Sequence, residues 1–464
     1  METLQRTANK GSVSTGEYSI TNSVKLEDTN TEYLQRAASG SDGDRRTMTL
    51  SMWLKRTQPG NDHIFYSQGS HVRFRWKTSD YFSLRLANGH EFENESRLFR
   101  DTAAWQHLVV AIDTTQSTNT NRVKIYWNGV QETDFDTAQY PDQNEELTLG
   151  QFSSVTTQLG WFVEGGYGFD GYIAEVNYID GLQKAPTDFG EVDSSSGIWK
   201  PKQYTDSYGS EGFFLNFDDS SSMGADSSGN GKNFNLNNVA AADQATDTPT
   251  NNFCTLNPLV NFKYTTNGIT EGGTVFGDNT GGGVGGAFGT MAVTAGKWYW
   301  EVKLNQQSSH YIGVSAVDDG DNVYASTDPQ EENSTFRFNI NAARREYVNS
   351  GSQGYGSLDE FTDFHSTGDI ISIALNMDDN QISIYGNGTL QSGVANTTLY
   401  DAANKMVVPF HGTINDECQY NFGGYSVWTP SSAASDANGY GTFEYAPPSG
   451  YYALCTKNLA QYGG

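Results

Sequence analysis

Short stretches in which apolar residues recur at every second position dominate the first part of the chain. In TMTLSMWLKR these residues are Met48, Leu50, Met52 and Leu54. The stretches HVRFRWK, YFSLRLAN, HLVVAID, RVKIYWNG and GYIAEVNYIDG follow as further short strands. A period of two gives a strand one apolar and one polar face, so we expect antiparallel sheets packed on one side. The turn residues between the stretches favour a β-sandwich.

A second series of such stretches follows in the C-terminal half. It contains GKWYWEVKL, HYIGVSAV, STFRFNIN, MVVPFHG and ECQYNFG. The clearest hairpin lies at its centre, in DIISIALNMDDNQISIYGNG, where MDDN is the turn between two alternating strands. We expect a second antiparallel sandwich here, and no stretch of the chain has the pattern of a long helix. The predicted fold class is all-β, with two jelly-roll sandwiches.

The residues between the two series are rich in Ser, Asp, Asn, Gly and Thr, which is typical of loops. Trp199, Tyr204 and Phe213 are nevertheless too apolar to remain in solvent, so we expect this segment to pack on the first sandwich. The predicted domains are an N-terminal arm (1–17), the first sandwich (18–190), a linker arm packed on it (191–260) and the second sandwich (261–464).

Two almost identical stretches, VKIYWNG and ISIYGNG, stand far apart in the sequence. They end in Asn128-Gly129 and Asn387-Gly388. Asn-Gly adopts positive φ easily and favours tight hairpins. We therefore interpret both pairs as turn residues of equivalent hairpins in the two sandwiches, and not as ligand-binding residues.

Composition and charge limit the function. With 50 Gly against 11 Pro and 13% aromatic residues, the composition is that of a turn-rich β protein. The net charge is −27, from 28 Lys and Arg against 55 Asp and Glu. Nucleic acids and anionic membranes attract basic proteins, so both are excluded as expected partners. No segment approaches the roughly 18 apolar residues of a membrane span, and we expect a soluble protein made in a cytoplasm.

The three cysteines are Cys254, Cys418 and Cys455. They form no CxxC pair and no Cys/His group with zinc-site spacing, so we expect no structural zinc. An odd and low number of cysteines also gives no disulfide framework.

Several of these stretches resemble known families. SMWLKR, WQHLVVAID, VKIYWNGV and FDGYIAEVNYIDG resemble a laminin-G-like, concanavalin A-like jelly-roll domain. GKWYWEV, YIGVS, DIISIALNMDDNQISIYGNG and CQYNFG resemble a SPRY domain. The resemblance implies the first fold in the N-terminal half and the second fold in the C-terminal half.

The order of the two domains and the phrases that join them resemble lectin-like structural and tail-fibre proteins of marine bacteriophages. These phrases are GLQKAPTDFGE, SGIWKPKQY, DSSGNGKNF, CTLNPL and PPSGYYALCTKNL. The resemblance implies a non-enzymatic virion surface protein, a tail fibre or head fibre, that binds host-surface glycan or a receptor through loops of its sandwiches. Its implied partners are other virion proteins, host glycan and further copies of the chain.

We expect no long anchoring domain or coiled-coil shaft before the first sandwich. A head-decorating or tail-accessory protein therefore remains open. The alternative function is a structural decoration or cement protein, which contacts other capsid or tail proteins and recognises no host.

Aromatic residues in Gly-rich loops are the candidate ligand-binding residues, because a flat ring stacks on a sugar face or anchors a partner. LGWFVEGGYGFDG and GYGSLDEFTDFHS are such loops, and a further tyrosine follows an acidic loop. The candidates are Trp161, Phe162, Tyr167, Tyr324, Tyr355 and Phe361. Core packing is the alternative for each of them.

Calcium is the candidate cofactor, because hard cations prefer several loop oxygens. In DSSGNG, Asp226 begins a sequence like the first half of an EF-hand loop, but Asn237 stands where the glutamate is expected. VDDGDN supplies Asp318, Asp319 and Asp321 without a full ligand set. Asx turns are the alternative explanation of both loops.

Glu132, Asp134 and Asp136 resemble the acidic triplet of glucanases that share the jelly-roll fold. Their i, i+2, i+4 spacing would place all three on one strand face. The third acid is Asp, however, and the triplet directly follows a WNG turn. Since no Ser/His/Asp or Cys/His set stands out either, we expect no enzymatic activity.

Overall fold

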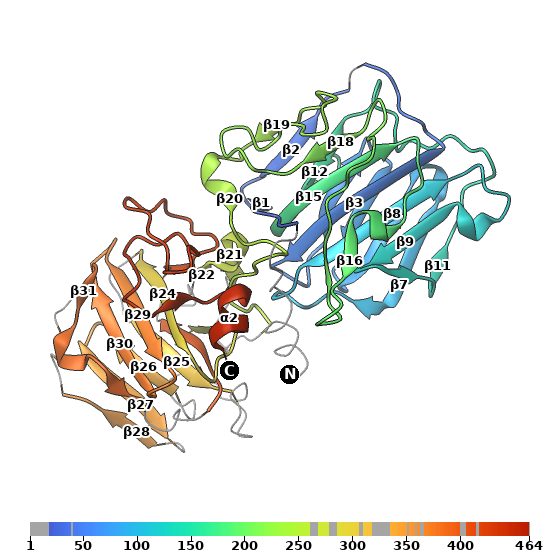
Figure 1. Ribbon diagram of the computed structural model, residues 1–464. Helices are drawn as coiled ribbons and strands as arrows, with labels where there is room; N and C mark the ends of the chain where they lie inside the picture. The colour runs from blue at the N-terminus through green and yellow to red at the C-terminus, as the bar shows by residue number, and fades with distance from the viewer. Residues whose placement is uncertain are drawn as a thin grey trace. The chain divides into compact units, whose positions relative to one another are not determined.

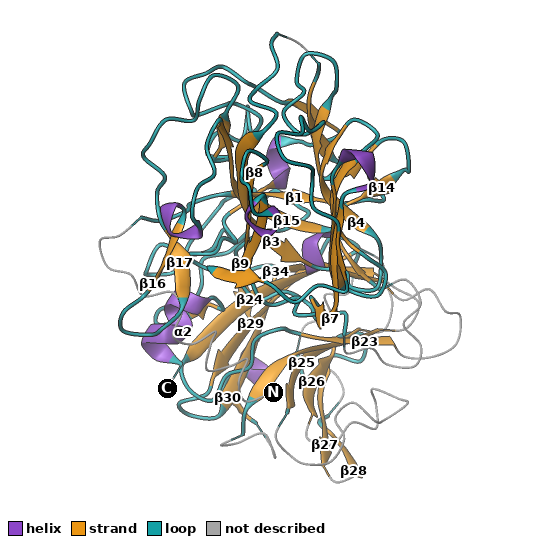
Figure 2. Ribbon diagram, turned by 90° about the vertical axis from the view of Figure 1, so that its right-hand side faces the viewer, coloured by secondary structure: helices purple, strands orange, loops and turns teal. Residues whose placement is uncertain are grey.

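The computed structural model describes residues 18–38, 40–259, 268–277, 285–305, 310–317, 335–349, 352–357, 360–361, 366–399, 405–413 and 417–463. Contacts within this part of the chain define two compact units, one inside Ser14–Thr250 and the other inside Asn251–Gly464. Strands and loops make up most of both units (Figure 2). No described helix is long and apolar enough to cross a membrane. The described helices are α2 (Thr456–Tyr462) and the 3-10 helices η1 (Ala87–Gly89), η2 (Asn119–Asn121), η3 (Pro186–Asp188), η4 (Ala241–Asp243), η5 (Glu271–Gly273) and η6 (Ser392–Val394).

The first unit is a sandwich of two antiparallel sheets. The long strands of one sheet, β3 (Thr47–Arg56), β8 (Gln106–Asp113), β9 (Val123–Trp127) and β15 (Gly171–Asp180), run side by side in Figure 1. In order across the sheet, the first sheet contains β10 (Val130–Glu132), β9 (Val123–Trp127), β8 (Gln106–Asp113), β3 (Thr47–Arg56), β15 (Gly171–Asp180), β1 (Ser23–Leu26) and β20 (Gln244–Ala245), with β18 (Phe213–Leu215) paired to β15. The second sheet contains β11 (Thr137–Ala138), β7 (Glu91–Leu98), β6 (Tyr81–Arg85), β5 (Val72–Trp76), β4 (His63–Gln68), β12 (Thr157–Leu159), β2 (Tyr33–Arg36) and β19 (Asn235–Asn237). Two small hairpins complete the unit, β13 (Trp161–Phe162) with β14 (Tyr167–Gly168) and β16 (Gly190–Val192) with β17 (Trp199–Pro201).

The core of the first unit lies between its two sheets. Leu50, Met52 and Leu54 of β3 are buried against residues such as Phe74 of β5 and Leu84 of β6. These are the apolar positions of the alternating stretches, so the period of two arises from burial of one strand face.

The residues after the first sandwich motif belong to the same unit. β18 pairs with β15, β19 pairs with β2, and β20 pairs with β1. The Phe213 ring stacks on Tyr178 in the core. The apolar residues of this segment therefore pack on the sandwich, although the expected domain boundaries themselves stay predictions.

The second unit is also a sandwich of two sheets. The first of them contains β21 (Ile269–Thr270), β22 (Val275–Gly277), β34 (Glu417–Asn421), β24 (Lys297–Leu304), β29 (Ile370–Asn376), β30 (Gln381–Gly386) and β31 (Thr389–Leu390), with β32 (Thr397–Thr398) paired to β30 and β35 (Tyr452–Ala453) paired to β24. The other contains β23 (Gly285–Phe288), β33 (Val407–Thr413), β25 (His310–Ala316), β26 (Thr335–Asn339), β27 (Arg344–Asn349) and β28 (Ser352–Tyr355). The β24–β35 pair is parallel, and the other pairs of these sheets are antiparallel. The expected fold class, two antiparallel β-sandwiches in series, is confirmed.

The repeated Asn-Gly pairs occupy equivalent turns. Asn128 and Gly129 join β9 to β10, with φ of 49° and 79°. Asn387 and Gly388 join β30 to β31, with φ of 46° and 78°. In each sheet this hairpin lies at the edge, so the interpretation of the pairs as turn residues is confirmed.

Candidate functional site

A row of polar side chains crosses one face of the sheet that runs from β11 to β19. The strand register places its members opposite one another on six adjacent strands: Gln35, Gln158, Ser67, Arg73, Arg85 and Glu91. Their immediate neighbours, such as Phe74 and Leu84, are buried in the core. Because side chains alternate between the two faces of a strand, the row lies on the face away from the core. We call this surface the polar face.

Three arginines gather at the centre of the polar face. Arg73 and Arg85 are directly opposite each other, and Arg75 lies two residues further along β5, opposite Ser83. Each arginine is half-buried, and none forms an ion pair with another described residue. Burial lowers the pKa of Arg73, and the charges of Arg75 and Arg85 lower that pKa further. Like charges opposite each other destabilise a sheet, so this arrangement favours an anionic partner.

Polar atoms without a hydrogen-bond partner lie beside these charges. Among the described residues, the Nε atoms of Arg73 and Arg75 and the Oγ atom of Ser83 are buried and unpartnered. Buried polar groups in folded proteins nearly always have a partner. These three atoms are therefore hydrogen-bonding groups that the described side chains leave open beside the arginines.

The β13–β14 hairpin borders the polar face with aromatic side chains. The Ser67 hydroxyl donates a hydrogen bond to the carbonyl oxygen of Trp161 (2.7 Å), which holds the hairpin against β4. The Trp161 ring is half-buried and stacks on Tyr33, with ring centroids 5.8 Å apart. Arg73 places its guanidinium 4.9 Å from the centroid of Phe162. Arginine donors and aromatic rings are thus adjacent, which is an arrangement suited to the hydroxyl groups and apolar faces of sugars.

The structure separates the three aromatic candidates of this hairpin. Tyr167 is 43% exposed, and Trp161 is half-buried at the border of the polar face. Phe162 is only 4% exposed, so it packs beneath Arg73 and presents no ring to a ligand. Of these residues, Trp161 and Tyr167 remain available for contact with a partner.

The aromatic candidates of the second unit form no such surface within the described residues. Phe361 is 7% exposed and packs edge-on against Phe338, so it belongs to the core. Tyr355 lies at the end of β28. Tyr324 lies outside the described residues.

The candidate calcium ligand Asp226 has an internal role. Its carboxylate accepts hydrogen bonds from the backbone N–H groups of Phe214, Ser228 and Lys232, at 2.8–2.9 Å. This is the turn chemistry that was the alternative to calcium. Asp318, Asp319 and Asp321 lie outside the described residues, and calcium binding stays a prediction.

The acidic triplet does not share one strand face. β10 ends at Glu132, whose carboxylate pairs with Arg97 at 3.2 Å. The Asp136 carboxylate accepts a hydrogen bond from the backbone N–H of Glu95 at 2.7 Å. The expectation of i, i+2, i+4 alignment is therefore wrong, because the strand stops before Asp134 and Asp136.

His107 lies near a serine without the geometry of a catalytic base. Its Nε2 is 2.8 Å from Ser51 Oγ, and its Nδ1 accepts a hydrogen bond from Trp199 Nε1–H at 3.0 Å. Because the indole N–H only donates, the proton of a neutral His107 is on Nε2 and points to Ser51. Burial also lowers the pKa of His107 to about 3. His107 therefore cannot activate Ser51 as a nucleophile.

A small cavity of about 180 Å³ lies beside β7 and β8. Arg97, Phe99 and Asp101 are among its lining residues, and burial raises the pKa of Asp101. Ligand pockets usually measure ~300–1,000 Å³. The cavity is thus smaller than a typical ligand pocket.

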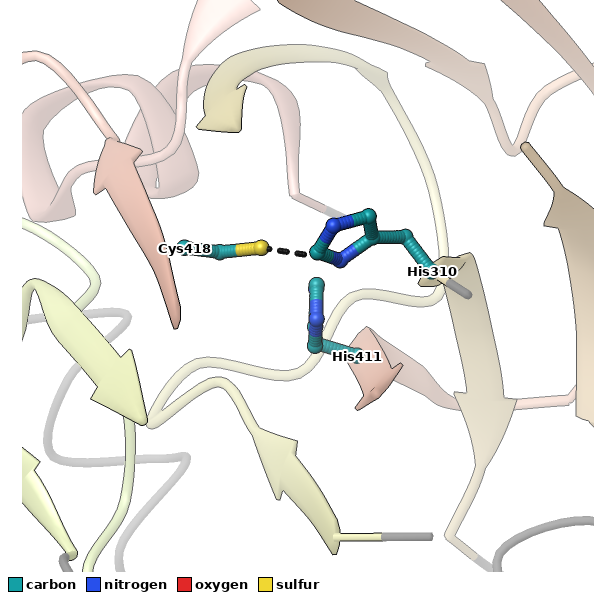
Figure 3. Close-up of side chains that lie close together, drawn as sticks. All are labelled: His310, His411 and Cys418. Carbon is teal, nitrogen blue, oxygen red and sulfur yellow. Dashed lines mark hydrogen bonds between the residues drawn. The ribbon is translucent and has the colours of Figure 1, made fainter. Parts of the chain in front are cut away.

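The second unit buries a group that the sequence spacing did not reveal. The side chains of His310, His411 and Cys418 meet in its interior, and their candidate ligand atoms all lie within 4.8 Å of one another (Figure 3). Each occupies a core-facing position of an alternating strand, which is the one signal that the sequence carried. The sequence could not predict that these three residues meet, because they lie on three different strands, β25, β33 and β34.

Comparison with known proteins assigns both units. Residues 28–183 match the family described as the concanavalin A-like lectin/glucanases superfamily. Residues 297–425 match the SPRY domain family. The chain carries a concanavalin A-like domain followed by a SPRY domain. No curated protein matches the chain.

Three solved structures that match parts of the chain have low sequence identity to it. The SPRY domain of human HERC1 is 17% identical, with 36% of this chain and 96% of that chain covered and a TM-score of 0.27. A putative carbohydrate binding protein from Bacteroides ovatus is 14% identical, with 47% of this chain and 59% of that chain covered and a TM-score of 0.32. The TRIM65 PSpry domain is 12% identical, with 36% of this chain and 87% of that chain covered and a TM-score of 0.27.

The two candidate sites therefore lie in different domains. The polar face and the β13–β14 hairpin lie in the concanavalin A-like domain, within its matched residues except for β19. The group of His310, His411 and Cys418 lies in the SPRY domain.

Proposed function

We propose that the concanavalin A-like domain binds a glycan at its polar face. The observation that carries the proposal is the cluster of Arg73, Arg75 and Arg85, which lacks ion-pair partners among the described residues and adjoins Trp161. The family match and the lectin-like fold support the same function.

The preferred ligand is a glycan with carboxylate or sulfate groups. Guanidinium groups bind such anions through paired, charge-assisted hydrogen bonds. Gln35 offers an amide for neutral hydroxyls, and Trp161 offers a ring for the apolar face of a sugar. Since the chain carries a net charge of −27, a local group of arginines is needed to attract an anion.

A glycan array with wild-type protein and three variants tests this proposal. We expect wild type to bind acidic glycans, and Arg75→Ala, Arg85→Ala and Trp161→Ala each to weaken binding by about 10- to 100-fold, as for loss of a charged hydrogen bond or a stacked ring. Rising salt should weaken binding by wild type, because exposed charges are screened.

Arg46→Ala is the matched control, since this exposed arginine pairs with Glu146 away from the polar face. It should bind like wild type, and circular dichroism should show that all variants are folded. Absence of glycan binding by wild type, or equal binding by folded Arg75→Ala and Arg85→Ala, would contradict the proposal.

For the whole protein we propose a place on the outside of a bacteriophage particle, as a non-enzymatic tail fibre or head fibre. The support is the order of the two domains together with the joining phrases of the sequence. Antibodies against the chain should label intact particles, and the isolated chain should bind host cells. Binding to assembled particles alone would favour the decoration or cement protein instead, and release of sugar from host polysaccharide would show an enzyme.

A further inference from the structure

The SPRY domain brings three metal-binding side chains together from both sheets of its sandwich. His310 begins β25 and His411 lies on the adjacent strand β33, whereas Cys418 lies on β34 of the opposite sheet. Figure 3 shows the thiol of Cys418 pointing at the imidazole ring of His310, with the His411 ring close to both. Nδ1 of His310 is 3.1 Å from Sγ of Cys418, and all three residues are fully buried.

His411 carries a buried nitrogen atom without a partner. Its Nδ1 lies 2.8 Å from the Tyr420 hydroxyl, and its Nε2 has no hydrogen-bond partner among the described residues. If Tyr420 donates to Nδ1, the Nε2–H proton has no acceptor, and if Nδ1–H donates to Tyr420, the Nε2 lone pair has no donor. Leaving such a group buried costs free energy in either tautomer.

The His411 ring is fully buried beside the aromatic rings of Phe276 and Tyr420. The Phe276 ring packs against the imidazole with 5.6 Å between the ring centroids and an angle of 64° between the ring planes. A neutral imidazole is the form of histidine that binds a metal ion.

We propose that His310, His411 and Cys418 form a binding site for one soft d10 metal ion, with copper(I) as its best match. Thiolate and imidazole ligands select Cu⁺ and Zn²⁺. Metal–ligand distances of about 2.0–2.3 Å place the ligand atoms of one ion roughly 3.5 Å apart. Since the candidate ligand atoms lie within 4.8 Å of one another, the group needs to close by about 1.3 Å at most. The ion would take the lone pair of His411 Nε2, and Tyr420 would accept the proton of Nδ1, as the second-shell partners of metal-bound histidines do.

Charge decides between the two ions. One thiolate and two neutral imidazoles carry a net charge of −1, so Cu⁺ makes the site neutral and Zn²⁺ leaves a charge of +1. An uncompensated charge in a buried site is unfavourable. Binding changes no oxidation state: the metal–sulfur bond replaces the S–H bond, and the thiol proton leaves to solvent.

The test compares two buried cysteines. Because the site is fully buried, the full chain is unfolded and refolded anaerobically with either Cu⁺ or Zn²⁺, desalted, and analysed for metal by mass spectrometry. We expect wild type and Cys455→Ser to retain one copper ion per chain, and Cys418→Ser to retain at least 10-fold less. Cys455 is the matched control because it is also buried but packs with Phe253 and Tyr299, away from the histidines.

X-ray absorption identifies the ligands of the metal ion in the wild-type protein. It therefore tests the site even if Cys418→Ser fails to fold. Copper with one sulfur and two nitrogen ligands supports the site. Retention of zinc and not copper, with the same ligands, supports the site and overturns the choice of ion. Absence of both metals from refolded wild type, an oxygen-only ligand shell, or full retention by folded Cys418→Ser would refute it.

Discussion

Glu175 and Glu301 are buried glutamates, one in each domain. Glu175 lies at a bulge of β15 with a φ of 48° and accepts a hydrogen bond from the Tyr18 hydroxyl at 2.7 Å. Glu301 accepts hydrogen bonds from the backbone N–H groups of Glu444 and Tyr445, both at 2.8 Å. Burial raises the pKa of Glu175 to about 8 and that of Glu301 to about 7, although these donors favour the charged form.

These raised pKa values predict that the protein is more stable at mildly acidic than at alkaline pH. The ordinary pKa of 4.5 applies in the unfolded chain, so the folded chain binds more protons between pH 4.5 and about 8. The contribution of the two glutamates to the free energy of unfolding is therefore fully present below pH 4.5, and it is lost as the pH rises through 7 and 8. Glu175 contributes on the order of 5 kcal/mol and Glu301 on the order of 3 kcal/mol. Urea unfolding at a series of pH values measures this change.

Glu175→Gln and Glu301→Gln should each flatten the pH dependence, because a neutral amide keeps the shape of the protonated side chain. Glu95→Gln is the matched control, since Glu95 is exposed. If the two buried-site variants lost stability with pH as steeply as wild type, both carboxyl groups would already be charged in the folded protein at pH 5.

At the scale of single elements, Gly129 is fixed by two constraints. It follows Asn128 in the β9–β10 turn with a φ of 79°. A Cβ atom at this position would lie 2.5 Å from the ring of Trp199. The ring belongs to β17 and contacts His107, so the turn, β17 and β8 pack together.

Gly129→Ala should destabilise the protein more than Gly60→Ala does. Gly60 has a φ of 88° but open space around the added carbon, so its substitution carries only the backbone strain of about 1–2 kcal/mol. At Gly129 the displaced Trp199 ring adds roughly 1–3 kcal/mol. Urea unfolding of both variants measures the difference. Equal losses would mean that the ring moves aside freely.

The long strands could be predicted from the sequence, whereas the polar face could not. Burial of one face produces the alternation of Met48, Leu50, Met52 and Leu54, and this pattern is visible locally. The polar face instead needs the register between strands that are distant in sequence, such as β12 with β2. Its hairpin was identifiable from Trp161 and Tyr167, because Gly-rich loops with aromatic residues mark it. The arginines beside them carried no local signal, since each one alternates with core residues like any outward-facing residue.

At the scale of the whole molecule, the residues that follow the matched concanavalin A-like region complete its unit. Lys55 is fully buried, and its Nζ lies 2.7 Å from the carboxylate of Asp247. The same carboxylate accepts a hydrogen bond from Trp105 Nε1 at 2.9 Å. Lys25 is likewise buried and pairs with Asp243 at 3.1 Å, in addition to Glu32. Residues beyond 190 thus supply the carboxylate that pairs with Lys55 and a second carboxylate for Lys25 in the interior of the sandwich.

A fragment of residues 18–250 should therefore fold, and a fragment of residues 18–190 should not. The shorter fragment lacks β17, β18, β19 and β20, and with them the Asp247 carboxylate that pairs with Lys55. Loss of one partner of a buried ion pair costs about 3–5 kcal/mol, which is a large share of the roughly 5–15 kcal/mol that stabilises a domain. Solubility, circular dichroism and thermal unfolding of both fragments measure the outcome. Asp247→Ala in the longer fragment separates loss of the ion pair from loss of the strands. This variant should lower the free energy of unfolding by the contribution of the Lys55–Asp247 ion pair and leave the fragment folded at low temperature. A cooperative thermal transition in the 18–190 fragment would show that the sandwich is complete without this segment.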